Sequence, residues 1–172
     1  MSIYGMITTA ACALEEVGRK LVEKRTGEKL GFDCDMSKDW EELRHHPENR
    51  KSQLICKGQI ELTHMENQGM VGGSHLLPSQ LVNASTAFLI GYCANYLHRE
   101  SQDKPGVTAD GVGTALILGG AIHNMAERVL RASVSDYLRF PKFPIKAVRG
   151  MVFNISDLCV LLGMALKLFK RK

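Results

Sequence analysis

The sequence lacks any regular spacing among its cysteines. The five cysteines are odd in number and widely scattered, and none of them forms a CxxC or CxxH motif. Closely spaced pairs are the usual sign of a zinc site, and a disulfide framework usually needs an even number. The sequence therefore predicts neither, and the cysteines are interpreted as small buried hydrophobic residues. They are Cys12, Cys34, Cys56, Cys93 and Cys159.

Other signals are also missing. A net charge of +4 over 172 residues is too small to indicate nucleic-acid binding. The chain begins without the basic residues that open a secretory signal peptide, so its first segment is interpreted as a retained helix. Gly119 and Gly120 have no Lys-Ser pair after them, which argues against a phosphate-binding loop. His45 and His46 are adjacent and would point in different directions on a helix, so no metal site is predicted there.

Charged residues are absent from Asn67 to His98. Within this stretch, residues 76–97 are about long enough to cross a bilayer, which takes ~20 residues. The other helix-like segments are shorter or interrupted by charge, and the composition, 45% apolar and 23% charged, is ordinary for a soluble protein. Hydropathy leaves a soluble bundle open, while the glycines of residues 111–120 favour the close helix contacts found in membranes.

Apolar periodicity predicts four helices and one insertion. The helices are expected at about residues 3–24, 76–98, 107–131 and 151–170. Residues 26–66, between the first two helices, are polar and turn-rich before they alternate as short strands do. The predicted fold is therefore a single, mainly α domain over residues 1–172. It is a four-helix bundle, expected to be transmembrane, with a small β-sheet insertion between helices 1 and 2.

Two acids are predicted to meet at one end of this bundle. Asn154 and Asp157 are three residues apart, so both would point the same way on a helix. Asp136 follows the third helix, and the loop after it reverses the chain, which would bring Asp136 opposite Asp157. Two facing carboxylates share a proton, so that one activates water while the other protonates a leaving group. Helix caps or arginine partners are the alternative roles for these acids.

Several stretches resemble the signal peptidase II family, the bacterial lipoprotein signal peptidases. They are "NQGMVGG", "ALILGGAIHNMAERV", "SVSDYLRF" and "FNISD", in this order, and "LEEVGRKLV" in the first helix is similar to a further family pattern. The resemblance implies an aspartyl endopeptidase of the bacterial cytoplasmic (inner) membrane, with four spans and both termini in the cytoplasm. The insertion at residues 26–66 would then lie outside the cytoplasm.

The resemblance also implies a reaction and partners. Such an enzyme cleaves the signal peptide of a prolipoprotein before its diacylglyceryl-modified cysteine, and it uses no metal or organic cofactor. The expected partners are the lipid-modified prolipoprotein and membrane lipids, with no nucleic acid, and the chain is expected to be a monomer. The family's catalytic aspartates map onto Asp136 and Asp157. Its supporting and substrate-binding positions map onto Asn154, Asn124, Glu127, Arg128, Asn67, Gly69 and Glu15.

The chain departs from the family pattern at four of these positions or their neighbours. Glu66 stands where the family has arginine, which reverses the charge, whereas Glu15 and Glu127 replace aspartates and keep it. His123 replaces a glycine. These changes and the rather polar helices leave an alternative open, in which the chain is a non-catalytic or solubilised relative that keeps the fold as a binding protein or helical bundle.

Overall fold

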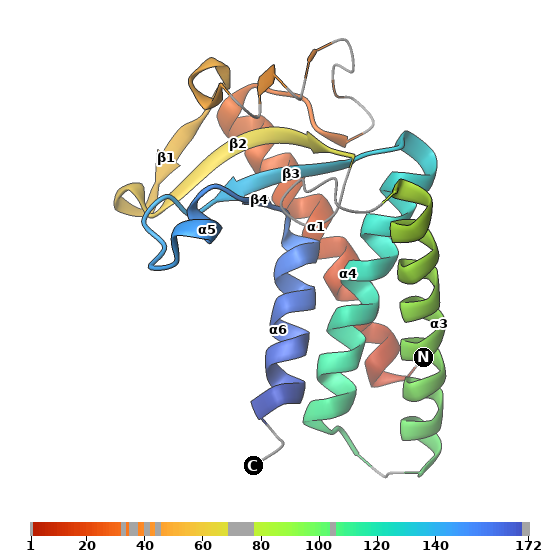
Figure 1. Ribbon diagram of the computed structural model, residues 1–172. Coiled ribbons are helices and arrows are strands. Elements are labelled where there is room, and N and C mark those ends of the chain that lie inside the picture. The colour runs from red at the N-terminus through yellow and green to blue at the C-terminus, as the bar shows by residue number, and fades with distance from the viewer. Residues whose placement is uncertain are drawn as a thin grey trace. The chain divides into compact units, whose positions relative to one another are not determined.

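A computed structural model describes residues 2–31, 34, 38, 39, 42, 43, 46–68, 78–103 and 106–169 (Figure 1). The chain divides into two compact units. The helix unit comprises Met1–Glu15, Gln80–Ala126 and Ile155–Lys172. The sheet unit comprises Glu16–Ser79 and Glu127–Asn154.

The long helices are α1 (Ile3–Thr26), α3 (Ser79–Asp103), α4 (Ala109–Arg131) and α6 (Ile155–Phe169). Charges at their ends suit the helix dipole, which favours acids in the first turn and bases in the last. Asp110 and Asp157 lie in the first turns of α4 and α6, and Arg131 lies in the last turn of α4. All four predicted helices are confirmed, with shifted ends.

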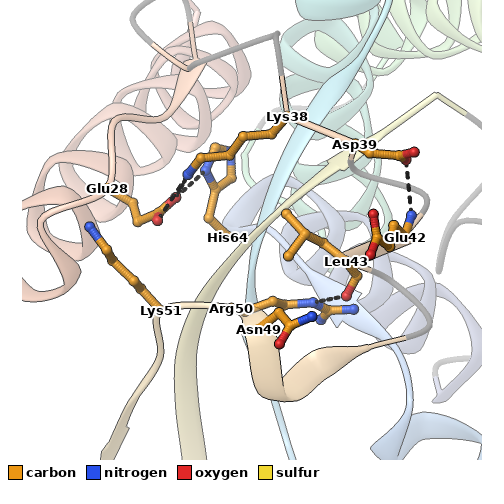
Figure 2. Close-up of a pocket in the computed structure, with 9 residues that line it drawn as sticks. All are labelled: Glu28, Lys38, Asp39, Glu42, Leu43, Asn49, Arg50, Lys51 and His64. Atoms are coloured by element: carbon orange, nitrogen blue, oxygen red, sulfur yellow. Dashed lines mark hydrogen bonds and ion pairs between the residues drawn. The ribbon is translucent and has the colours of Figure 1, made fainter.

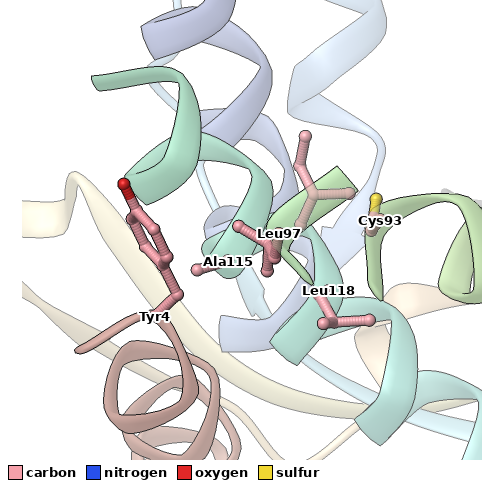
Figure 3. Packing of buried hydrophobic residues seen from close by; sticks show 6 residues of the cluster. Tyr4, Cys93, Leu97, Ala115 and Leu118 are labelled. Atoms are coloured by element: carbon pink, nitrogen blue, oxygen red, sulfur yellow. The ribbon is translucent and has the colours of Figure 1, made fainter. Parts of the chain in front are cut away.

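The helix unit is packed through small residues and a short apolar core. In that core α1, α3 and α4 meet (Figure 3), and its buried members are Tyr4, Cys93, Leu97, Ala115, Ile117 and Leu118. The phenol oxygen of Tyr4 accepts a hydrogen bond from the backbone N–H of Thr108, so its polar end is also satisfied.

Glycines let α4 and α6 approach closely. A Cβ atom at Gly163 would lie 2.4 Å from the carbonyl oxygen of Gly113, and one at Gly120 would lie 2.4 Å from that of Ser156. Only a residue without a side chain fits at such a distance. The predicted role of the glycines of residues 111–120 in close helix contacts is therefore confirmed.

The sequence predicts helices that cross a bilayer. Among the described residues, no helix combines the length and the apolar character that a membrane crossing takes.

The sheet unit contains one antiparallel sheet in the order β1-β2-β3-β4 (Figure 1). Its strands are β1 (Gln53–Ile55), β2 (Ile60–Asn67), β3 (Val134–Arg139) and β4 (Val152–Phe153). The short helices η2 (Pro47–Asn49), η3 (Cys56–Gly58) and α5 (Lys146–Arg149) lie in the connections. The register places Met65 opposite Asp136 and Glu66 opposite Ser135.

One sequence prediction about this sheet is wrong, and the sheet also shifts the start of one helix. The sheet is not confined to the insertion at residues 26–66, because β3 and β4 come from the segment between α4 and α6 and supply half of its strands. The helix predicted at residues 151–170 begins only at Ile155, because Val152 and Phe153 pair with β3. Strand pairing between distant segments overrides the local pattern in both cases.

Candidate active site

Asp136 is a buried carboxylate on β3, held by two amide side chains. The side-chain nitrogen of Asn67 donates to its Oδ2 at 2.8 Å, and that of Asn154 donates to its Oδ1 at 3.1 Å. The sheet register explains the first contact. Asp136 faces Met65, and Asn67, two residues further along β2, lies on the same face. Each carboxylate oxygen thus has an N–H donor, which orients the group.

Asn154 differs from its predicted position. It is fully buried and lies between β4 and α6, so the prediction that it shares a helix face with Asp157 is wrong. Its side chain reaches Asp136 instead. The physical reason is the short strand β4, which ends one residue before Asn154 and delays the helix start.

Asp157 lies in the helix unit, in the first turn of α6, and is 7% exposed. The side-chain nitrogen of Asn124, on α4, donates to its Oδ1 at 2.9 Å. Glu15, which is 1% exposed on α1, accepts a hydrogen bond from the backbone N–H of Ser156 at 2.6 Å. Glu15 therefore caps the N-terminus of α6 from a neighbouring helix. Asn124 and Glu15 both stabilise the turn that carries Asp157.

A second polar cluster lies on the opposite face of β2 and β3. Side chains alternate along a strand, so Glu66 and its partner Ser135 point away from Asn67. Glu66 accepts hydrogen bonds from the hydroxyls of Ser133 and Ser135, and its Oε1 lies 2.9 Å from Nε2 of His64. No local sequence pattern predicts His64, Ser133 or Ser135 as members of a site.

The groups around Glu66 determine the direction in which its pKa shifts. Burial alone would raise the pKa of Glu66, but hydrogen bonds from His64, Ser133 and Ser135 outweigh it and lower that pKa to about 2. Arg131 at the end of α4 also pairs with Glu66 at 3.1 Å. The arginine that the family pattern has at position 66 is thus replaced by an acid whose positive partner comes from another element.

Glu127 joins the same cluster from α4. Its Oε2 accepts a hydrogen bond from the backbone N–H of Ser135, and its Oε1 pairs with Arg19 at 3.1 Å and with Arg131 at 3.3 Å. The predicted supporting position is therefore a buried anchor for the strand that carries Asp136. Arg128 is half-buried in the last turn of α4. Gly69, the remaining predicted site residue, lies outside the described residues.

A polar pocket adjoins this cluster (Figure 2). Its volume is about 330 Å³, and His64 forms part of its lining. In it the Lys38 ammonium pairs with Glu28 at 2.9 Å, and Nε of Arg50 donates to the carbonyl oxygen of Leu43. The lining consists of Glu28, Lys38, Asp39, Glu42, Leu43, Asn49, Arg50, Lys51 and His64.

The cysteines follow their prediction only in part. Cys93 and Cys159 are buried, whereas Cys56 is exposed, so the interpretation of Cys56 as a buried residue is wrong. Burial and the negative charge of Glu66 raise the pKa of Cys34 to about 11 against the opposing charge of Arg131. Cys34 is therefore a protonated thiol at neutral pH, which is a poor nucleophile.

Comparison with known proteins decides the family. A family model described as "Signal peptidase (SPase) II" matches residues 32–171. The chain belongs to the signal peptidase II family. It is thus an aspartic-type signal peptidase, which confirms the resemblance drawn from the sequence motifs.

Curated relatives and solved structures agree with this family. The lipoprotein signal peptidase of Chlorobaculum tepidum is 29% identical over 134 residues, which cover 71% of this chain and 80% of that protein. That of Halothermothrix orenii is 32% identical over 114 residues, or 65% of this chain and 70% of that protein.

The signal peptidase II chain also shares its fold with two solved structures described as bacterial membrane enzymes studied by the in meso method. One has a TM-score of 0.69 and is 15% identical in sequence. The match covers 97% of this chain and 85% of the chain in that structure. The other has a TM-score of 0.61 and is 18% identical in sequence. That match covers 97% of this chain and 90% of the chain in the structure.

Proposed function

We propose that this signal peptidase cleaves the signal peptide of prolipoproteins before a diacylglyceryl-modified cysteine. The family match carries the proposal, and the names of the relatives from two bacteria, both lipoprotein signal peptidases, support it. The enzyme would act as a monomer in a bacterial cytoplasmic membrane, crossing it several times with both termini in the cytoplasm.

Asp136 and Asp157 are the proposed catalytic pair. Both carboxylates are at least nine-tenths buried, and amide side chains orient both of them. Burying a carboxylate costs desolvation free energy, and side chains buried at such a cost are found most often at functional sites. Asn154, which holds Asp136, is only three residues before Asp157 in the chain.

The two acids would have complementary roles. We assign the role of general base to Asp136, whose two carboxylate oxygens each accept a hydrogen bond from an amide N–H. It takes a proton from water while the water oxygen attacks the scissile carbonyl carbon. Asp157 gives its proton to the departing nitrogen as the C–N bond breaks. The products are a free carboxyl group and a free amine.

The remaining predicted site residues act as supports. Asn67, Asn154 and Asn124 orient the acids, and Glu15 fixes the turn that carries Asp157. Glu127 fixes the strand that carries Asp136, with Arg128 beside it. Gly69 is proposed to meet the substrate backbone, on the strength of the family pattern alone.

Cleavage of a lipidated prolipoprotein in detergent tests the catalytic pair. We expect Asp136→Asn and Asp157→Asn each to lower kcat by about 10²–10⁴-fold, which is the usual contribution of general acid-base catalysis. Asp103→Asn, at an exposed position near the end of α3, is the matched control and should keep full activity. Circular dichroism and thermal unfolding would show that all variants fold. Equal activity in all of them would eliminate the pair.

Two further comparisons test the substrate and the location. The diacylglyceryl-modified precursor should be cleaved and the unmodified precursor should not, whereas equal cleavage of both would refute lipid recognition. The protein should stay with membranes after a wash at alkaline pH. Release by that wash without detergent would refute an integral location.

A further inference from the structure

Three potential metal ligands meet on the face of the sheet opposite Asp136. One ligand atom from each of Cys34, His64 and Glu66 lies within 4.8 Å of the other two. His64 and Glu66 are almost fully buried on β2, and Cys34 is half-buried in the segment after α1. We propose that these three side chains form a site for a zinc ion, which the proposed peptidase reaction does not use.

The ligand set suits zinc. Zn²⁺ binds cysteine sulfur, histidine nitrogen and carboxylate oxygen at ~2.0–2.3 Å, and such mixed sets with three protein ligands leave one position for water. Magnesium and calcium prefer oxygen ligands alone, so a thiol and an imidazole disfavour them. Nε2 of His64 and Oε1 of Glu66 are 2.9 Å apart, which already places two of the donors side by side.

Polar groups surround two of these ligands. A metal-binding histidine usually directs its second ring nitrogen at a carboxylate. Here Nδ1 of His64 lies 3.6 Å from Oε2 of Glu28, while Nε2 faces Glu66. The hydroxyls of Ser133 and Ser135 hold the Glu66 carboxylate in place. The Glu66 carboxylate is therefore held in place, with the imidazole beside it and Glu28 within reach of the second ring nitrogen.

Arg131 marks the position of that ion. One of its terminal nitrogens, Nη2, lies 3.0 Å from Sγ of Cys34 and 3.1 Å from Oε1 of Glu66. The guanidinium thus supplies positive charge between two of the proposed ligands, and zinc would displace that nitrogen. The other terminal nitrogen, Nη1, can keep its contacts with Glu127 at 3.3 Å and Ser135 at 3.0 Å.

The pocket offers a route for the ion. His64 belongs both to the pocket lining and to the ligand set, and Glu28 lies beside it in the same lining (Figure 2). Binding breaks the S–H bond of Cys34, forms a bond between sulfur and zinc, and releases the proton to water. The oxidation state of every atom stays the same.

Cobalt substitution tests the site, because Co²⁺ replaces Zn²⁺ and absorbs light when thiolate is bound. The purified whole chain should bind one Co²⁺ with a thiolate-to-cobalt charge-transfer band, and zinc should remove the band. Cys34→Ser should abolish the band and weaken zinc binding at least about tenfold, and His64→Gln should weaken it similarly. Cys56→Ser is the matched control, since Cys56 is exposed and outside the ligand set.

Two kinds of result would contradict the zinc site. Absence of the band in the wild type, or its loss in Cys56→Ser with retention in Cys34→Ser, would overturn the site. Arg131→Lys shortens the competing side chain while keeping its charge, so zinc should bind more tightly than it does to the wild type. Unchanged affinity in that variant would refute the assigned position of the ion. None of these measurements uses peptidase activity, so their failure leaves the proposed function untouched.

Discussion

The helix unit and the sheet unit are stabilised in different ways. In the helix unit, α4 and α6 meet through glycines, and the core is a small set of apolar side chains. In the sheet unit, the buried side chains of Glu66 and Glu127 form ion pairs, and Glu66 also accepts a hydrogen bond from a serine hydroxyl. The first arrangement is sensitive to added volume, and the second to lost charge. Each unit carries one of the two proposed catalytic acids.

The largest effect on stability should come from removing charge in the sheet unit. Glu66→Gln removes the buried anion that pairs with Nη2 of Arg131 and leaves Arg131 its pair with Glu127, so we expect the free energy of unfolding to fall by about 3–5 kcal/mol. Glu61→Gln is the matched control, because both side chains of the Glu61–Arg139 pair are partly exposed and its loss should cost at most about 1 kcal/mol. Thermal or denaturant unfolding measures both. Equal losses would contradict the comparison.

Acid should weaken the same unit. The pKa of Glu66 is about 2 in the folded chain and about 4.5 when it is unfolded. Because the folded value is depressed, the stabilisation is fully present above pH 4.5 and is lost as pH falls toward 2. The difference corresponds to at most roughly 3 kcal/mol. Unfolding measured from pH 6 to pH 2 should show a steeper loss in the wild type than in Glu66→Gln, and parallel curves would refute this.

Added volume should disturb the helix unit. A Cβ atom at Gly163 would lie 2.4 Å from a backbone oxygen of α4, so Gly163→Ala must push the two helices apart. We expect a loss of about 1–3 kcal/mol in thermal unfolding, with lower peptidase activity because Asp157 is on the displaced helix. If Gly163→Ala were as stable as the wild type, α4 and α6 would not be in close contact at Gly163.

The smallest effect should have the opposite sign. A Cβ atom at Gly91, on α3, would meet no other atom within 4 Å. Alanine is a better helix former than glycine, so Gly91→Ala should raise stability by about 0.5–1 kcal/mol without changing activity. This variant is the control for Gly163→Ala. Loss of stability in Gly91→Ala would mean that another part of the folded protein packs against α3 at Gly91.

The sequence predicted much of the fold because helices depend on local periodicity. All four helices and the strand pair β1-β2 are confirmed, and several motifs taken together in their order led to the family. The strand β3 was missed because it is defined by pairing with β2, which is distant in sequence, and β4 was missed because it has only two residues. That pairing moved Asn154 from a helix face to a position where it holds Asp136.

The buried cluster around Glu66 was also beyond prediction. Its members come from β2, the end of α4, the start of β3 and the segment after α1, so no local spacing reveals them. The only signal was Glu66 itself, a negative residue where the family pattern has a positive one. A charge reversal indicates that a compensating partner exists, but it does not identify the partner, because the partner lies far away in sequence.

The sequence by itself therefore determined the helices and the family, since periodicity and motif order are properties of the chain, and it supplied the two aspartates of the proposed pair. The tertiary structure decided which side chains hold Asp136 and Asp157 and how Glu66 is neutralised. These depend on hydrogen bonds and ion pairs between segments that only folding brings together. Such contacts act over a few ångströms in space, whatever the distance along the chain.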